Sequence, residues 1–193
     1  MVEDFVNKEN KKNEKNNEEK NNKNNNGFIK NENTLSYQVL NIKRISRTVQ
    51  GGRKMRFNAL VVVGDKNGKC GFALEKNNET LGAIKKAFSS ASKRMINVFI
   101  NKKNFSIESQ VYGKFGATKV FLRPAPQGTG IVAGGPVRAI LELAGVKNVT
   151  SKVYGSKTRK NVLEATFKAI KELNKRHFIR MEIKNEIASI NKK

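Results

Sequence analysis

The residues of this chain that are best suited to bind a ligand are six cations that flank a glycine pair. Residues 43–56 read KRISRTVQGGRKMR, and no acidic residue occurs from position 33 through position 64. Adjacent glycines suit the positive φ values of a tight hairpin turn. We therefore predict a rigid basic hairpin whose side chains bind the phosphates of a polyanion. The cations of this hairpin are Lys43, Arg44, Arg47, Arg53, Lys54 and Arg56.

A second group of cations lies near the start of the last predicted helix. Lys157, Arg159 and Lys160 belong to the segment GSKTRK, which follows directly on a predicted strand. This segment resembles the end of a phosphate-binding loop, but it lacks the GxxxxGK order that such loops share. Because the N-terminus of a helix attracts phosphate oxygens, we predict a second basic patch at these three residues.

Catalytic and metal-binding patterns are weak. The sequence has one cysteine, Cys70, and one histidine, His177, which excludes a disulfide within the chain and a Cys/His zinc site. The nine acidic residues after position 33 include no close pair suited to acid–base work. We therefore expect no enzyme activity, no metal, no cofactor and no small-molecule substrate.

One glycine-rich stretch leaves a nucleotide-dependent enzyme as an alternative. Gly128, Gly130 and Ala133 match the G-x-G-x-x-A spacing of dinucleotide-binding loops. Such a loop needs a buried strand directly before it, whereas Pro124 and Pro126 occupy that place. The acidic residue expected about 20 positions later is also missing. A backbone turn is the favoured interpretation of this stretch.

Composition and charge point to a polyanionic partner. The 193 residues carry a formal charge of +23, and residues 1–33 contain seven lysines and seven acids, so the whole excess lies in residues 34–193. A compact body this basic repels itself until an anion binds, and nucleic acid is the leading candidate. An anionic membrane surface is the rival, although no apolar run reaches the ~18 residues of a spanning helix and no signal peptide is visible. A single thiol is in keeping with a reducing, cytoplasmic location.

We expect four segments of the α+β class along the chain. Residues 1–33 include twelve asparagines and few apolar side chains, which predicts a disordered leader. Residues 34–103 and 104–175 are expected to form two domains, and residues 176–193 a basic C-terminal tail. The first domain is small for an independent core, so we expect it to lean on its neighbour.

Periodicity predicts the elements of the two domains. In the first, strands are expected at 41–49, 54–63 and 69–75, the last two joined by an Asn-Gly turn, followed by a helix from about 80 to 100. That helix would bury residues 81, 84, 88, 91, 95 and 98. In the second, strands are expected at 106–112, 117–123 and 149–154, with a turn at 113–116 and a helix at 137–144 between Pro136 and Gly145. Asn161 followed by Glu164 resembles a capping box that opens a last helix reaching residue 173.

Three blocks of the sequence resemble a known family. They are RISRTVQGGRKMRFNALVVVGDKNGKCGFA, a helix ending in KRMINV, and GTGIVAGGPVRAILELAGVKNV followed by YGS. In this order they resemble the bacterial type of the small-subunit ribosomal protein five family, from about residue 41 to residue 173. The resemblance implies a double-stranded-RNA-binding-like βββα domain followed by a two-layer α/β domain with a left-handed βαβ crossover. That handedness comes from the family alone, since the general rule predicts a right-handed crossover.

The resemblance also implies a role. It implies a structural constituent of the small ribosomal subunit that binds 16S-type rRNA near the decoding region and the channel where mRNA enters. It further implies a contribution to translational accuracy and subunit assembly, contacts with small-subunit proteins four (uS4) and eight (uS8), and rRNA binding by the cations named above. The loop expected to border the spectinomycin-sensitive RNA includes Ile45, Ser46, Thr48, Val49, Gln50, Gly51 and Gly52, and the loop expected to contact protein four comprises Gln127, Gly128, Thr129 and Gly130.

The chain departs from the family pattern at Gln127, where the family often has an acidic residue. This departure affects the polar details of the expected contact with protein four and leaves the expected fold unchanged. The alternative function is a free-standing, double-stranded-RNA-binding regulatory protein, which would need the same basic surface without the ribosomal partners.

Overall fold

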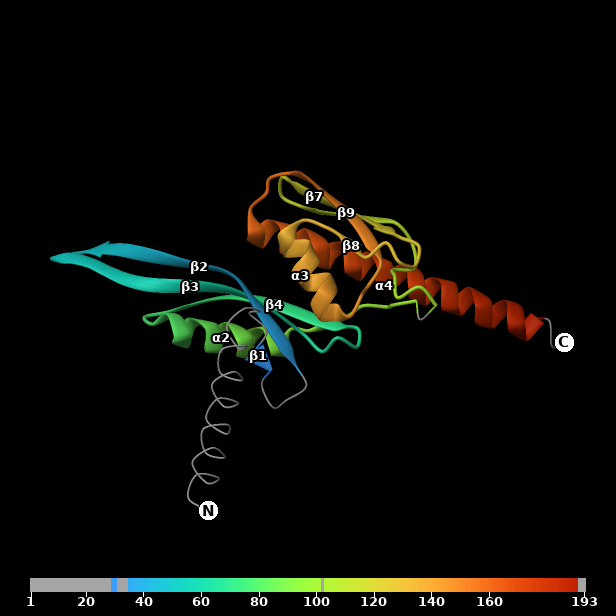
Figure 1. The fold of residues 1–193 in the computed structure, drawn as a ribbon, viewed down its shortest axis with the longest axis horizontal. Coiled ribbons are helices and arrows are strands. Elements are labelled where there is room, and N and C mark those ends of the chain that lie inside the picture. The colour runs from blue at the N-terminus through green and yellow to red at the C-terminus, as the bar shows by residue number, and fades with distance from the viewer. Residues whose placement is uncertain (1–28, 31–34, 102, 191–193) are drawn as a thin grey trace, which may run out of the picture.

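The computed structural model describes residues 29–30, 35–101 and 103–190, which form two sheets and three helices (Figure 1). The first sheet has the strand order β1-β2-β3-β4-β5, and the second has the order β6-β7-β9-β8. This is the α+β class predicted from the sequence. The elements are β1 (Ile29–Lys30), β2 (Ser36–Val49), β3 (Gly52–Gly64), β4 (Lys69–Asn77), α2 (Thr80–Lys93), β5 (Ile96–Asn97), β6 (Val111–Phe115), β7 (Thr118–Pro124), β8 (Ile131–Val132), α3 (Gly135–Ala144), β9 (Val149–Gly155) and α4 (Arg159–Ile190).

Part of the predicted leader belongs to the first sheet. Ile29–Lys30 pairs antiparallel with Tyr37 and Ser36 of β2, so these two residues are a strand where disorder was predicted. The rest of that prediction, for residues 1–28 and 31–33, lies outside the described residues.

The first unit is the predicted antiparallel meander of three strands followed by a helix. α2 packs on one face of β2, β3 and β4, but it ends at Lys93 and not near residue 100, because Ile96–Asn97 pairs with β4 as a further strand. The predicted apolar face was also partly wrong. Leu81 is 70% exposed, and the buried residues are Ala83, Ala87 and Ala91. Three alanines four positions apart lie on one side of the helix, where their small side chains allow its backbone to approach the sheet.

The second unit is a four-stranded sheet with α3 and α4 packed on one face (Figure 1). α3 is bounded as predicted by a proline in its first turn and by Gly145, whose φ of 90° ends the helix. β8 and β9 are parallel neighbours joined by α3, which makes the βαβ unit, and the hand of its crossover stays a prediction. The first strand lies later than predicted and includes Gly113, which was expected in a turn. The carbonyl oxygen of Ala165 in α4 lies where a Cβ of residue 113 would be, so this position needs glycine for space. The turn is at Gly116, which has a φ of 56°.

α4 begins earlier than predicted. The carbonyl of Thr158 accepts the N–H of Val162 at 3.0 Å, which closes the first helical turn. Asn161 therefore lies inside the helix, and the predicted capping box was wrong.

α4 also extends to Ile190, so residues 176–190 of the predicted basic tail are helical. We call residues 175–190 the arm, which projects away from the sheets (Figure 1). Near its start, Arg176 Nη1 donates to the carbonyl of Gln110 at 3.2 Å. The ring of His177 stacks on Phe99 with 4.2 Å between centroids. These contacts involve residues far away in the sequence. The weak amphipathicity of the arm therefore could not predict them.

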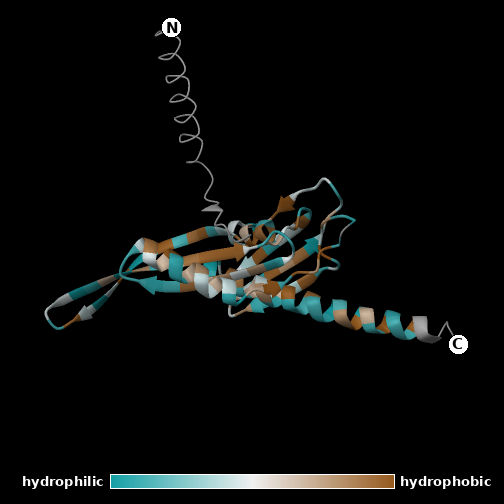
Figure 2. Cartoon of the chain, turned by 90° about the horizontal axis from the view of Figure 1, so that it is seen from below, coloured by the Kyte–Doolittle hydropathy of each residue, from teal (hydrophilic) through white to brown (hydrophobic). Residues whose placement is uncertain are grey.

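β3 lies between two hydrophobic cores. Ala59, Val61 and Val63 face α2, whereas Leu60 and Val62 belong to a larger core that includes α3, α4 and the second sheet. The first unit thus shares a hydrophobic core with the second unit, as expected from its small size. Figure 2 shows hydrophobic residues concentrated on the packed strands, while the projecting hairpin of β2 and β3 is mainly hydrophilic.

Candidate nucleic-acid interface

The predicted basic hairpin is a two-stranded projection that we call the finger, residues 43–56 (Figure 1). β2 and β3 stay paired as far as Val49 and Gly52, whereas β4 pairs with β3 only as far as Phe57. The turn residues are Gln50 and Gly51, one position earlier than the predicted glycine pair. Gly51 has a φ of 85°, and no described atom lies within 4 Å of the place of a Cβ there. Glycine is therefore needed for its backbone conformation and not for space.

Strand alternation divides the six cations of the finger between two faces. Residues directly opposite each other in a ladder share a face, and so do residues two apart in one strand. The register of β2 and β3 determines which cations lie on the face that carries Leu60 at the base of the finger. That face carries Lys43, Arg47, Lys54 and Arg56, and the opposite face carries Arg44 and Arg53.

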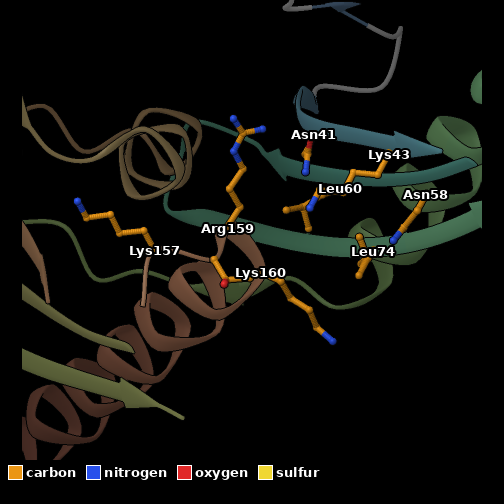
Figure 3. A pocket seen from close by; sticks show the side chains of 9 residues that line it. Asn41, Lys43, Asn58, Leu60, Leu74, Lys157, Arg159 and Lys160 are labelled. Atoms are coloured by element: carbon orange, nitrogen blue, oxygen red, sulfur yellow. The ribbon is translucent and has the colours of Figure 1, made fainter. Parts of the chain in front are cut away.

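A groove of about 450 Å³ lies at the base of the finger, between the first sheet and the start of α4 (Figure 3). It brings Lys43, at the base of the predicted basic hairpin, together with the second predicted basic patch. In Figure 3, Arg159 reaches from α4 toward β2, while Lys157 and Lys160 point to other sides of the groove. The lining residues are Asn41, Lys43, Asn58, Leu60 and Leu74 from the first sheet, Lys157 and Thr158 from the segment before α4, and Arg159 and Lys160 from its start.

Arg159 is anchored across the groove by a bulge in β2. The pairing of β2 with β3 shifts between Val39 and Asn41, which makes Leu40 the extra residue of a β-bulge. Arg159 Nη1 donates to the carbonyl of Leu40 at 2.6 Å. The bulge thus supplies an acceptor outside the ladder. Since a guanidinium has five N–H donors in a fixed plane, this bond orients Arg159 and leaves other donors for a phosphate.

A second hollow of about 610 Å³ continues along the same face toward the tip of the finger. Its lining includes Lys76, which the sequence analysis missed and which pairs with Asn58 across β3 and β4. The alternation of β4 could have revealed it, because Lys76 lies two residues after the groove residue Leu74. No acidic side chain of the described residues lines the groove or this hollow. We call their cations the basic track: Lys43, Arg47, Lys54, Arg56, Lys76, Lys157, Arg159 and Lys160.

The basic track concentrates positive charge at some cost to the free protein. Arg47 lies directly opposite Lys54 in the ladder, and like charges in that position destabilise a strand pair. The N-terminus of α4 adds the partial positive charge of the helix dipole beside Lys157 and Lys160. A row of phosphates would relieve both repulsions, so the arrangement is suited to the backbone of a nucleic acid.

The expected protein-contact loop, residues 127–130, lies apart from the basic track. None of its residues lines the groove or the second hollow. The loop is held by Asn148, whose Oδ1 accepts the N–H of Gly130 at 3.1 Å and whose Nδ2 donates to the carbonyl of Asn104 at 2.7 Å. Gly128 and Gly130 have φ values of 92° and 73°, and the next helix starts only at Gly135. This is the backbone turn favoured by the sequence, which exposes residues 127–129 to solvent.

Cys70 is buried, and this burial together with the negative charge of Asp65 raises the pKa of its thiol to about 12. The thiol therefore stays protonated at neutral pH and is a poor nucleophile. Within the described ranges, no group of three His, Cys, Asp or Glu side chains could hold a metal ion. No helix in these ranges is long and apolar enough to cross a membrane.

The fold and the basic track define a basic protein of two α+β units that share a core. Family models divide at the same place as the two units. The model described as Ribosomal protein S5, N-terminal domain, matches residues 35–99, and the model described as Ribosomal protein S5, C-terminal domain, matches residues 113–183. The chain belongs to the ribosomal protein S5 family, which confirms the resemblance found in its sequence.

Similar curated proteins carry the name small ribosomal subunit protein uS5. The one from Mycoplasmopsis agalactiae is 47% identical over 146 residues, which cover 76% of this chain and 63% of the relative. The one from Malacoplasma penetrans is also 47% identical, over 75% of this chain and 62% of the relative. The one from Ureaplasma parvum is 51% identical over 144 residues, 73% of this chain and 70% of the relative. The aligned part thus spans just under two thirds of the first two relatives.

Proposed function

We propose that this chain is a structural constituent of the small ribosomal subunit that binds 16S-type rRNA through the basic track. The observation that carries the proposal is the groove in which Lys43 of the finger meets Lys157, Arg159 and Lys160 from the start of α4 and the residues just before it, with no acidic side chain among the described lining residues. The names of the relatives support the ribosomal setting. Such a track presents cations to phosphates and not to base edges, so it would recognise the shape of folded RNA more than its sequence.

We further propose the finer role that the family resemblance implies. The tip of the finger, around Gln50 and Gly51, would border rRNA near the decoding region and the site of spectinomycin action. Loop 127–130 would contact small-subunit protein four, with protein eight and incoming mRNA as further neighbours. A chain placed there would contribute to translational accuracy and subunit assembly in the cytoplasm without a catalytic role of its own.

A pair of matched charge reversals tests the role of the track. Arg47→Glu with Lys54→Glu alters the track face of the finger, and Arg44→Glu with Arg53→Glu makes the same change of charge on the opposite face. We expect the first pair to reduce the fraction of chain that cosediments with small subunits in sucrose gradients. It should also lower the slope of log affinity for rRNA against log salt by roughly two units, about one per lost phosphate contact. The second pair should have a smaller effect on both.

Equal effects of the two pairs would contradict the assignment of the track face. The wild-type chain provides the control for the ribosomal setting itself. If most of it sediments apart from small subunits at physiological salt, the free-standing RNA-binding regulator becomes the better explanation.

A further inference from the structure

The outer face of the second sheet is left open by the helices. α3 and α4 cover the inner face, where Val111, Val120 and Leu122 are buried (Figure 1). The residues that alternate with these along β6, β7 and β9 point the other way, and most of them are exposed. Part of the sheet surface therefore remains available in the free chain.

The register arranges this outer face in rows across three strands. Tyr112 of β6 lies opposite Phe121 of β7, which lies opposite Lys152 of β9. In the next row, Lys119 lies opposite Tyr154. Neighbouring strands are about 4.8 Å apart, and rows two residues apart are separated by about 7 Å. We call this set of residues, completed by Lys114 and Arg123, the platform.

Two tyrosine rings stand exposed on the platform. Tyr112 is 66% exposed and stacks on Phe121, with 4.4 Å between centroids and 29° between ring planes. Tyr154 is 51% exposed on the far side of β7. A large aromatic ring at such exposure leaves apolar surface in water, which a stacked base would cover.

The charge of the platform favours an anionic partner. Its charged members are all cations, and no outward residue of β6, β7 or β9 within the described chain is acidic. Cations interleave with the rings, so the apolar surface is divided into the Tyr112–Phe121 pair and the ring of Tyr154 and does not form the continuous patch typical of a protein-docking face. The cations are Lys114, Lys119, Arg123 and Lys152.

We propose that the platform binds single-stranded RNA, with one base stacked on Tyr112, another on Tyr154, and the intervening phosphates on Lys119 and Lys152. Open four-stranded sheets with exposed aromatic rings can bind unpaired nucleotides in this way. The platform shares no residue with the basic track, so this inference goes beyond the proposed binding of folded rRNA.

Affinity for two RNA probes tests the platform. The probes are a fluorescently labelled oligouridylate of about 12 nucleotides and an RNA duplex of about 16 base pairs, each titrated with the full chain. Tyr112→Ala and Tyr154→Ala should each weaken binding of the oligouridylate about 10-fold and leave duplex binding unchanged. Tyr112→Phe keeps the ring and should keep the affinity. Phe178→Ala, which removes a ring that is 58% exposed on the arm, is the matched control and should change neither.

Intrinsic fluorescence gives a second, direct measurement. The chain has no tryptophan and three tyrosines, of which Tyr37 is only 9% exposed. Stacking of bases on Tyr112 and Tyr154 should therefore quench most of the exposed tyrosine emission when the oligouridylate is added. The duplex should quench it little.

Several outcomes would overturn the platform. One is unchanged oligouridylate affinity in both alanine variants. Another is a photoreactive phenylalanine at position 112 that crosslinks only to protein within small subunits, which would make this face a protein-docking surface. If Arg47→Glu with Lys54→Glu abolishes duplex binding while the tyrosine variants behave as wild type, the platform is wrong and the proposed function stands. The reverse pattern would overturn the basic track and leave the platform in place.

Discussion

Gly51 supports the basic track through its backbone conformation, and Arg159 supports it through its charge and its bond to the backbone of β2. Gly51 allows the turn that closes the finger, and Arg159 donates to the carbonyl of Leu40 while it faces the groove. Neither role is visible in a count of cations. Single residues therefore affect RNA binding in two ways, by the charge they carry and by the backbone geometry they maintain.

Substitution of Gly51 separates these two effects. Gly51→Ala keeps the charge but places a Cβ at a φ of 85°, which costs roughly 1–2 kcal/mol for most residues. We expect faster amide hydrogen exchange across the finger and weaker rRNA binding in this variant. Gly51→Asn is the control, because asparagine tolerates the left-handed region better. Equal exchange in the two variants would show that the turn is not limited by its φ.

One carboxylate, that of Glu108, contacts two residues near the start of the arm. Glu108 Oε2 lies 2.8 Å from His177 Nδ1, and Glu108 Oε1 accepts a bond from Arg180. The hydrogen bond with His177, followed by the bond and the positive charge of Arg180, lowers the pKa of Glu108 below its ordinary 4.5, although partial burial opposes the shift. The ionised form is therefore favoured in the folded arm.

This shift gives the arm a pH dependence. A carboxyl whose pKa is lowered by folding contributes stability at neutral pH and loses that contribution as the pH falls through the lowered pKa. We expect ¹³Cα NMR shifts of residues 176–190 to move toward coil values as the pH drops below about 4.5. Glu108→Gln should show the loosened state already at neutral pH. Glu172→Gln, which removes only the pairing with Arg176, is the control, and identical titrations of wild type and Glu108→Gln would contradict the role of Glu108.

The local sequence pattern predicted the elements that are determined by residues close to one another in the sequence. The alternation of Val61 and Val63 and the proline and glycine that bound α3 were sufficient for β3 and for that helix. The arm was missed because its contacts with Phe99 and Glu108 join residues about 70 positions apart. Gly113 was misread as a turn because only the packed backbone of α4 reveals why a side chain is excluded there. The cations of the site other than Lys76 could be predicted, but the division of the finger cations between two faces required the register of the strands.

At the scale of the whole molecule, the two units are parts of one folded body. Leu60, Val62 and Cys70 of the first sheet are fully buried or nearly so in the core that they share with α3 and α4. Because that core joins the finger to the start of α4, the two sides of the groove keep a fixed spacing. RNA that fits both sides binds a preformed surface, so binding does not carry the entropic cost of ordering the protein.

The shared core predicts that the first unit is unstable alone. A fragment of residues 35–103 would expose Leu60 and Val62, and each buried side chain of this size contributes about 1.5–3 kcal/mol. We expect the fragment to show no cooperative thermal unfolding by circular dichroism, while the full chain unfolds in a single transition. A fragment that melts cooperatively near the temperature of the full chain would contradict the shared core as the source of stability.

The bulge at Leu40 also sets the phase of β2. Before it, Tyr37 and Val39 lie on the α2 side of the sheet, whereas after it the odd-numbered Asn41 and Lys43 lie on the groove side. Since side chains alternate with a period of two, a strand of the same sequence without the bulge would place Leu40 opposite Leu60 and turn the following residues over. Lys43 and Arg47 would then leave the groove face and Arg44 would take their place, with composition and net charge unchanged. Deletion of Leu40 would instead remove the extra residue and keep Lys43 and Arg47 on the groove face, so the bulge, and not the number of cations, determines which of them face the groove.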